Sequence, residues 1–381
     1  MSPRWTSQLT GSVVYEADAR LVAATLPPGC ASLAILDGPY GLRKAAWDTV
    51  PRGGTLADLY QGHLDDVGRV CAASASLYLW NTSAGWAELH PHILSRGWTF
   101  RALITWDKGV SSMAGKVDTA GLRTWFDVTE VCGFYQREPN EIDLWNQWGE
   151  AHPVRRYLEA ARVAAGLSNA EIDAALGVSG MARHWFTWTQ WCLPSAERYE
   201  QLRALLPGLE RSLAELRAEH ETLWADFRSQ WEEVRAPFVA PLGVGNVWST
   251  GQVAGPERLK DGNGDTMHPC QKPLLFAERM ILASSRPGDL VWAPFGGTLR
   301  ELVAAERMAR LDPAEARRVV TCELNQDGKD YIGAPLEQIG AEVREKGGQV
   351  GLFGCAQGRG AELQVPPVSQ ASQLQLLQRA R

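Results

Sequence analysis

The sequence lacks the features that mark several large classes of proteins. No apolar run reaches the ~18 residues of a membrane span, and no apolar secretion signal stands near residue 1. Its seven cysteines are scattered without a Cys-x-x-Cys pair, which is typical of reduced thiols in the cytoplasm. No group of His, Cys, Asp and Glu has metal-ligand spacing, and no internal repeat is visible. We therefore expect a cytoplasmic protein with no membrane span and no bound metal.

The sequence also has no excess of positive charge. Its 38 Lys and Arg and 44 Asp and Glu give a formal net charge of −6. If the chain binds nucleic acid, its basic side chains must gather in one cleft, because phosphate attraction is electrostatic. With 381 residues the chain can bury a large core, and we expect one main domain with an insertion.

A polar block, Asp37-Gly38-Pro39-Tyr40, directly follows the apolar run 31–36. In open α/β sheets, ligands bind where strands end in this way. The Asp37 carboxylate and the following backbone carbonyls are hydrogen-bond acceptors, and Tyr40 offers a flat face. Together they suit a planar ring that carries an exocyclic amine. A plain β-turn is the alternative, and this block alone does not decide between the two.

A second block lies far downstream. The segment His268–Pro273 precedes a helical pattern, the strand 290–292, and a Gly-Gly turn at 294–298 that opens another helix. Such a strand–turn–helix unit is typical of nucleotide binding, because small residues let a ligand approach free backbone N–H groups. The next strand pattern ends in Glu323, at the distance where an acidic residue usually binds a ribose diol.

These blocks, in this order, resemble the amino-group DNA methyltransferases that use S-adenosylmethionine, in their circularly permuted form. The resemblance covers residues 10–110 and 245–335, and its most specific part is the spacing from His-Pro-x-x-Lys-Pro to Pro-Phe-Gly-Gly. It implies a Rossmann-like, mostly parallel α/β sheet with helices on both faces, and double-stranded DNA as partner, hence a place at the nucleoid. It implies a catalytic set of Asp37, Gly38, Pro39 and Tyr40. It implies a cofactor set of Lys272, Pro294, Phe295, Gly296, Gly297, Thr298 and Glu323.

Two positions depart from this family's pattern. Gly38 stands where proline is usual, which keeps the key carbonyls in place. Ala293 stands where an acidic residue commonly precedes Pro-Phe, which removes a polar group near the cofactor. These departures keep open a catalytically decayed DNA-binding protein as an alternative. A cytosine-C5 methyltransferase would need a thiolate at the catalytic strand tip, and Cys270 stands elsewhere in the sequence. Methylation of RNA or protein is a further alternative.

Strand and helix patterns alternate through both ends of the chain, which predicts a mostly parallel sheet. The segment 131–136 is expected to be an antiparallel strand. Expected strands are 12–18, 31–36, 76–80, 99–106, 290–292 and 318–322, and expected helices are 19–25, 56–72, 84–95, 274–285 and one through residue 310. We divide the chain into a catalytic half at 10–150, a helical insertion at 151–236, a cofactor half at 237–340 and a flexible tail at 341–381.

Within the insertion, a helix is expected at 169–176, with Ser168 and Glu171 forming a capping box. A second short helix, capped by Ser179, would complete a helix-turn-helix that reads the major groove of DNA. A structural helical subdomain is the alternative. Candidate DNA contacts are Arg155, Arg156, Ser179, Arg183, His184 and Gln190.

The insertion is also rich in aromatic residues. We expect Trp188 and Trp191 to be core residues rather than base-stacking platforms. The stretch 207–234 reads as one long amphipathic helix that packs on the other helices or forms a homodimer seam. His220 on its apolar stripe is expected to be a packing residue.

The target base and the tail leave alternatives open. An acidic first catalytic residue such as Asp37 is commoner in family members that methylate adenine N6, although cytosine N4 fits the same chemistry. The tail carries Gln349–Phe353, which resembles peptides that dock on the replication sliding clamp. Alternatively, Leu352 and Phe353 anchor the C-terminus on the sheet domain.

Overall fold

One sheet organises the chain in the computed structural model, which describes residues 1–109, 121, 123, 125–137, 141–240, 243–325 and 329–344. Within these residues the sheet has nine strands in the order β1-β2-β9-β8-β3-β4-β6-β5-β7. The strands are β1 Trp5–Thr6, β2 Val13–Glu16, β3 Ala31–Leu36, β4 Cys71–Asn81, β5 Thr99–Asp107, β6 Thr129–Arg137, β7 Val247–Ser249, β8 Leu290–Ala293 and β9 Arg318–Glu323.

Most neighbouring strands run parallel, as predicted. The pairs β2–β9, β9–β8, β8–β3, β3–β4 and β5–β7 are parallel, while β6 is antiparallel to both β4 and β5, and β1 to β2. Strand β3 from the first half of the sequence lies between β4 and β8, with Ala34 opposite Trp292. The carboxyl ends of β3 and β8 therefore meet at one edge of the sheet, although their residues are far apart in sequence.

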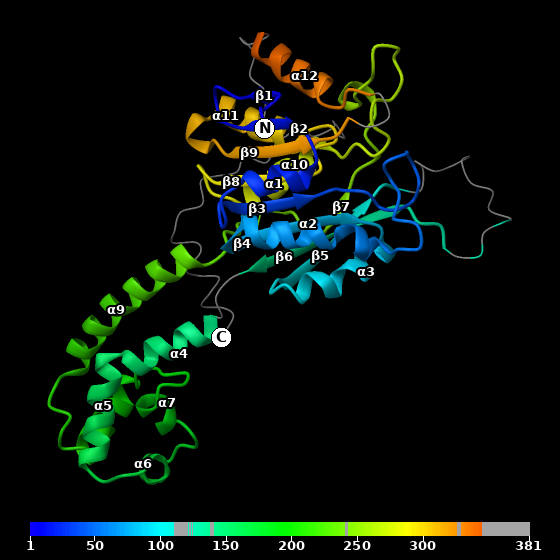
Figure 1. Ribbon diagram of the computed structural model, residues 1–381. Coiled ribbons are helices and arrows are strands. Elements are labelled where there is room, and N and C mark those ends of the chain that lie inside the picture. The colour runs from blue at the N-terminus through cyan, green and yellow to red at the C-terminus, as the bar shows by residue number, and fades with distance from the viewer. Residues whose placement is uncertain are drawn as a thin grey trace. The chain divides into compact units, whose positions relative to one another are not determined.

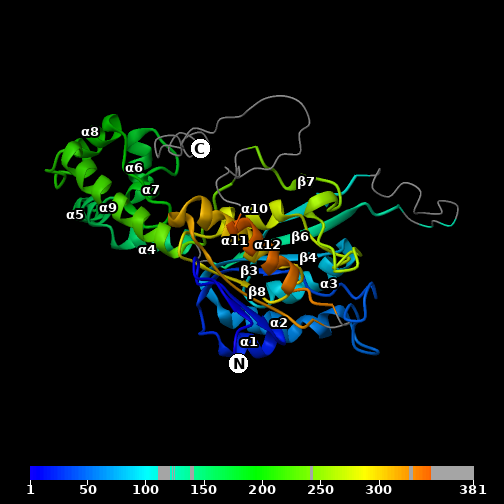
Figure 2. The same ribbon diagram turned by 90° about the horizontal axis from the view of Figure 1, so that it is seen from above.

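Helices cover both faces of this sheet (Figures 1 and 2). Alternation along β3 shows why its run is continuously apolar. Leu33 and Ile35 join the core beneath one set of helices, while Ala34 and Leu36 join the core beneath the other. The first set is α10 Leu274–Ser284, α11 Arg300–Leu311 and α12 Gly333–Arg344, and the second is α1 Ala19–Thr25, α2 Leu56–Val70 and α3 Ser83–Leu94.

Within its described residues the insertion contains helices joined by turns and no strand. It has a core of its own, built on Val154, Leu158, Trp185 and Leu202. Its first helix begins at Glu141, ten residues before the predicted boundary. Its helices are α4 Glu141–Ala151, α5 Pro153–Ala164, α6 Asn169–Leu176, α7 Ala182–Phe186, α8 Ala196–Leu205 and α9 Leu213–Val234. No described helix of the chain is long and apolar enough to cross a membrane.

The apolar stripe of α9 packs within the insertion. The Phe227 ring lies 5.7 Å from the Trp145 ring and 5.3 Å from the Trp148 ring, measured between centroids. His220 Nδ1 lies 3.3 Å from His152 Nε2, so His220 is a packing residue as predicted. Of the two roles predicted for this helix, packing on the other helices of the insertion is confirmed. The homodimer seam stays a prediction.

Two predictions about the insertion are wrong, one for Ser179 and one for Trp188. Ser179 does not cap α7, because the turn is held instead by Asp173 of α6, whose carboxylate accepts from the N–H groups of Gly180 and Ala182 at 2.7 and 2.8 Å. Trp188 is 44% exposed, whereas Trp191 is 1% exposed and lies in the core. The capping box of α6 is present as predicted.

Candidate active site

A cavity of about 260 Å³ lies where β3 and β8 end. Its walls bring together ten of the eleven residues predicted to be catalytic or cofactor-binding; Tyr40 stands just outside. The two blocks of the sequence therefore meet in space. The predicted residues in the walls are Asp37, Gly38, Pro39, Lys272, Pro294, Phe295, Gly296, Gly297, Thr298 and Glu323.

The turn after β8 needs its glycines. A Cβ on Gly296 would lie 2.8 Å from Thr321 Oγ1 and 2.9 Å from the Cys322 carbonyl oxygen, closer than real Cβ contacts allow. Gly297 has φ +47° and donates its N–H to Glu323 Oε2 at 2.7 Å. The Gly296 N–H donates to the Cys322 carbonyl at 2.8 Å. Gly296 is therefore required by the packing of the protein itself, and the N–H groups of both glycines are used inside the protein rather than left free as expected.

Glu323 is fixed in the cavity wall by the backbone. Its Oε2 accepts from Gly297 and its Oε1 accepts from the Leu324 N–H at 2.9 Å. A carboxylate held by two N–H groups keeps a fixed orientation in the cavity wall.

The structure explains why glycine occupies position 38. A Cβ there would lie 2.6 Å from Tyr60 Oη and 2.8 Å from the Phe295 ring. The Tyr60 hydroxyl in turn donates to the Pro39 carbonyl at 3.2 Å, so it also fixes the backbone of the catalytic block. The other departure, Ala293, is buried inside β8, and the cavity wall includes the next residue, Pro294.

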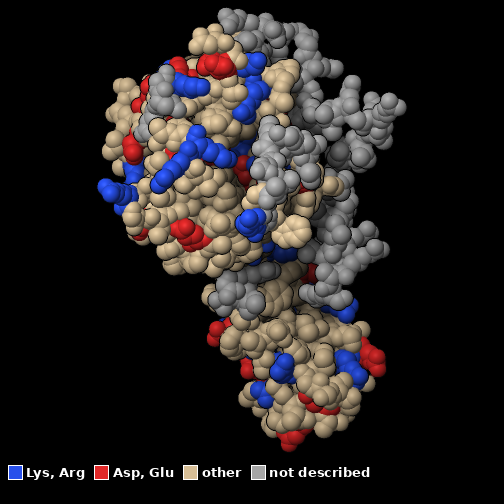
Figure 3. Space-filling model, turned by 90° about the vertical axis from the view of Figure 1, so that its right-hand side faces the viewer, with Lys and Arg blue, Asp and Glu red and all other residues tan. Residues whose placement is uncertain are grey.

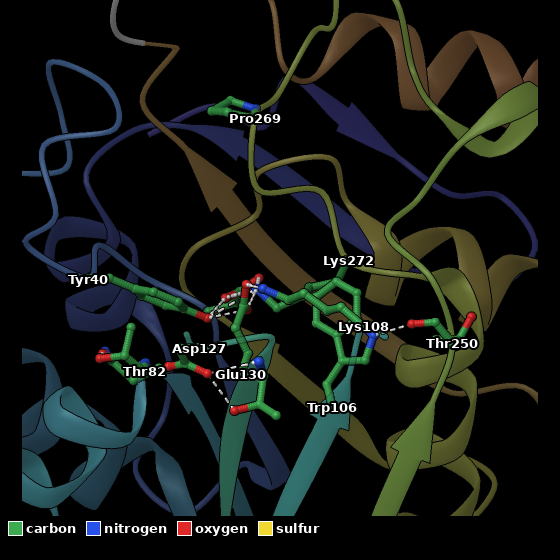
Figure 4. Close-up of polar contacts among 12 residues, drawn as sticks. Tyr40, Thr82, Trp106, Lys108, Asp127, Glu130, Thr250, Pro269 and Lys272 are labelled. Carbon is green, nitrogen blue, oxygen red and sulfur yellow. Dashed lines mark hydrogen bonds and ion pairs between the residues drawn. The ribbon is translucent and has the colours of Figure 1, made fainter. Parts of the chain in front are cut away.

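Asp37, in the cavity wall, belongs to an ionic cluster. Figure 4 shows the other members of the cluster, Tyr40, Lys108, Glu130 and Lys272. Lys272 Nζ contacts both Asp37 oxygens, at 2.8 and 3.0 Å, and lies 3.1 Å from Glu130 Oε2. The Tyr40 hydroxyl accepts from Lys272 at 3.0 Å and lies 3.0 Å from Asp37 Oδ1 and 3.2 Å from Glu130 Oε2. Lys108 Nζ donates to Glu130 Oε1 at 2.5 Å. Lys272, predicted to lie near the cofactor, thus also contacts the catalytic carboxylate.

Burial and charge pairing act against each other in this cluster. Burial raises the pKa of Asp37, and the Lys272 ammonium opposes that shift. Burial alone would raise the pKa of Glu130, but the ammonium groups of Lys272 and Lys108 lower it to about 2. Burial alone would lower the pKa of Lys272, but Asp37 and Glu130 raise it above its usual range. Glu130 and Lys272 are therefore charged at neutral pH.

Several residues of the site were missed by sequence reasoning. Glu130 and Lys108 carry no motif; they meet because Glu130 lies opposite Trp106 across the β5–β6 pair and Lys108 follows β5. His268 stood inside a recognised block, and it stacks on Trp47 with 5.3 Å between ring centroids. Burial lowers the pKa of His268 to about 4. Further wall residues without a sequence signal are Tyr60, His63 and Glu301.

One candidate DNA contact is wrong. Arg155 is 5% exposed and donates to the carbonyl oxygens of Gly149, Glu150 and Phe186 at 2.8 to 3.0 Å, so its guanidinium holds the insertion together. The other candidates stay predictions. Exposed ones are Arg156, Ser179, Arg183 and Gln190, and His184 is half-buried. On the face that Figure 3 shows, Lys and Arg are mixed with Asp and Glu. The sliding-clamp segment Gln349–Phe353 lies outside the described residues.

Comparison with known proteins identifies the family. A family model of DNA methylases, covering N6 and N4 methyltransferases, matches residues 31–338, which is most of the chain. The chain belongs to this family. As a member of this family, the methyltransferase uses S-adenosylmethionine as cofactor. The predictions of family, α/β fold and cofactor are confirmed.

Relatives of this methyltransferase include type II enzymes. M1.MboII of Moraxella bovis is 21% identical over 309 residues, which are 81% of this chain and 89% of that protein. M.HinfI of Haemophilus influenzae is 34% identical over 101 residues, and the matched segment is 26% of this chain and 23% of M.HinfI. The solved PvuII DNA methyltransferase, described as cytosine-N4-specific, is similar with a TM-score of 0.48 and 13% identity, over 90% of this chain and 94% of that one.

The cavity fits the cofactor of the methyltransferase. Gly297, at φ +47°, lies in the cavity wall, where a Cβ would meet nothing closer than His268 Nε2 at 3.7 Å. The backbone-held carboxylate of Glu323 lies in the same wall, which suits a residue that would bind ribose hydroxyls. The Phe295 ring adds an apolar surface. These residues would hold S-adenosylmethionine in the cavity that Asp37 also lines.

Replacing Gly38 by Ala should impair the site rather than the fold as a whole. Because the added Cβ meets Tyr60 and Phe295, we expect at least a tenfold loss of methyl transfer and a modest loss of stability, on the order of 1–3 kcal/mol. Initial rates and thermal melting measure both. Gly262→Ala is the matched control, since nothing lies within 4 Å of a Cβ there. A wild-type rate for Gly38→Ala would contradict this close packing.

Replacing Glu323 by Gln should weaken cofactor binding. The amide removes the charge and can no longer accept at both oxygens, so we expect roughly tenfold weaker binding of S-adenosylmethionine, about 1.4 kcal/mol. Calorimetric titration measures the dissociation constant. Glu337→Gln, at an exposed position of α12, is the control. An unchanged dissociation constant would remove Glu323 from the cofactor site.

Proposed function

We propose that this methyltransferase transfers a methyl group to the exocyclic amine of a base flipped out of double-stranded DNA, at a specific sequence, with adenine N6 as the favoured target. Cytosine N4 is the alternative. The observation that carries the proposal is that the Asp37 block and the Gly296–Gly297 turn line the same cavity. The target amine is inaccessible inside a duplex, so the base must leave the stack to reach Asp37.

The acceptors at the tip of β3 address the weak nucleophilicity of the amine. Its lone pair is delocalised into the ring, and acceptors on its two N–H bonds favour a pyramidal nitrogen whose lone pair is free to react. We assign this role to the Asp37 carboxylate and the Gly38 carbonyl, because both residues line the cavity. When bound, S-adenosylmethionine supplies the methyl group, whose bond to sulfur breaks as its bond to nitrogen forms. The nitrogen then releases one proton, and Asp37 is the base beside it. Tyr40 offers its ring as a surface for the base.

A thiolate mechanism at cytosine C5 does not fit the described site. Cys270 lies in the cavity wall, but burial raises the pKa of its thiol, which disfavours the thiolate nucleophile near neutral pH. The catalytic tip of β3 carries Asp37 instead. This favours amine methylation over the C5 alternative.

The helical insertion is proposed to recognise the target. The short helices α6 and α7 are joined by Gly177–Met181, and exposed Arg156, Arg183 and Gln190 are available to phosphates and bases. Docking on a sliding clamp through Gln349–Phe353, a homodimer and a place at the nucleoid stay predictions.

The choice of base is decided by product analysis. DNA treated with the purified enzyme and isotopically labelled S-adenosylmethionine is digested to nucleosides and analysed by mass spectrometry. Labelled N6-methyl-2′-deoxyadenosine supports the favoured target, and labelled N4-methyl-2′-deoxycytidine supports the alternative. No labelled nucleoside from any duplex, with cofactor binding intact, would support the decayed DNA-binding protein.

Replacing Asp37 by Ala should abolish methyl transfer and leave the fold intact. Loss of an organised acceptor typically costs ~10²–10³ in rate, and Asp37 lies at the surface of the cavity rather than in the core. Single-turnover rates measure the effect, and circular dichroism checks folding. Asp65→Ala removes an exposed carboxylate and serves as control. A rate within tenfold of wild type would remove Asp37 from the mechanism.

A further inference from the structure

The ionic cluster lies between two cavities. Asp37 and Lys272 line the cofactor cavity, whereas Glu130 and Lys108 line a second cavity of about 280 Å³. Lys272 is 8% exposed in its side chain and contacts carboxylates that face opposite cavities. The two carboxylates that contact Lys272 therefore lie in the walls of different cavities.

In this arrangement the catalytic acceptor is already occupied. Lys272 Nζ lies within hydrogen-bond distance of both Asp37 oxygens, and charge-assisted bonds of this kind are stronger than those to a neutral amine. Each carboxylate oxygen can accept more than one hydrogen bond, so a target amine competes with Lys272 for Asp37 and weakens or displaces the contact of the ammonium. The displaced ammonium then needs another buried partner, because an unpaired buried charge is costly.

We propose that Lys272 shifts from Asp37 to Glu130 when the target amine arrives, so that Glu130 is a positioning residue that acts through Lys272. This inference rests on the proposed methylation of a base amine at Asp37. It assigns Glu130 a role in making the acceptor available, without contact to the reacting atoms.

The two oxygens of Glu130 are divided in a way that suits this role. Oε1 is taken by Lys108 at 2.5 Å, while Oε2 faces Lys272 at 3.1 Å and the Tyr40 hydroxyl at 3.2 Å. Lys108 thus holds Glu130 in place and leaves Oε2 for Lys272. The shift is short, because Lys272 already lies within ion-pair distance of both the Asp37 and the Glu130 carboxylate.

Neighbouring groups compensate Asp37 after the shift. The Tyr40 hydroxyl donates to Asp37 Oδ1 at 3.0 Å and keeps this hydrogen bond when Lys272 has left. The Lys272 ammonium lies over the Tyr40 and Trp80 rings, at 5.2 and 5.5 Å from their centroids, which favours a cation along this path. No bare charge is created at either end.

The shift also changes the proton affinity of Asp37. When the Lys272 ammonium moves away, the pKa of Asp37 rises, and Asp37 becomes a better base for the proton that the methylated nitrogen releases. The negative charge of Glu130 contributes to raising that pKa. The titratable groups that face Asp37 are Lys272, Glu130, Tyr40, Tyr60, Cys132, Cys270 and Glu301.

Glu130→Gln tests the proposal in the full-length enzyme. Without the carboxylate, Lys272 stays on Asp37, so we expect the single-turnover rate on the high-pH plateau to fall at least tenfold. The dissociation constant of S-adenosylmethionine should stay within threefold. Because Asp37 must be ionised and loses a neighbouring negative charge, the acid limb of the rate profile should move to lower pH. Glu130→Asp keeps the charge and should restore part of the plateau rate.

Lys108→Met is a second variant with the opposite expected shift. It leaves Glu130 in place and removes a positive charge, so the acid limb of the rate profile should move to higher pH. If Glu130→Gln melts far below wild type, the rate profile of Lys108→Met tests the role of Glu130 instead. A plateau rate of Glu130→Gln within threefold of wild type would overturn the proposal, as would acid limbs that move in the same direction in both variants. Absence of methyl transfer by the wild-type enzyme would refute the proposed function instead.

Discussion

The ion pair between Asp37 and Lys272 is the interaction on which the site depends. It joins residues 235 positions apart, one at the tip of β3 and one just before α10. Burying both charges has a desolvation cost that a structural pair rarely recovers fully. Its presence at the cavity edge is understandable if the carboxylate must stay ionised until the amine arrives. The adjacency of β3 and β8 makes this pair possible, and the cofactor turn follows β8 directly.

Much of this arrangement follows from the sequence. The apolar run 31–36 and the helix 19–25 were predicted with the bounds that the structure has, because a strand buried on both faces and a Pro-Gly stop leave few alternatives. The ordered blocks around Asp37 and Gly296 predicted which residues share one cavity. Local patterns sufficed there, because parallel strands carry their carboxyl ends to the same edge.

Other features depend on contacts that no local pattern encodes. Gly38 is explained only by Tyr60 and Phe295, which come from α2 and from the turn after β8. Glu130 enters the site through antiparallel pairing across a long connection, and Arg155 turns inward to satisfy carbonyl groups of neighbouring segments. Leu299, at φ +52° before α11, holds a backbone conformation that the sequence would have assigned to glycine, and it is fully buried.

The central claim is that cofactor and catalytic tip share the cavity at the ends of β3 and β8. Ultraviolet crosslinking of methyl-labelled S-adenosylmethionine, followed by peptide mapping, tests this without knowledge of the DNA sequence recognised. We expect label on peptides that contain Tyr60 or Phe295, and loss of that label when excess S-adenosylhomocysteine competes. Competable label confined to the helical insertion, 141–234, would contradict the account.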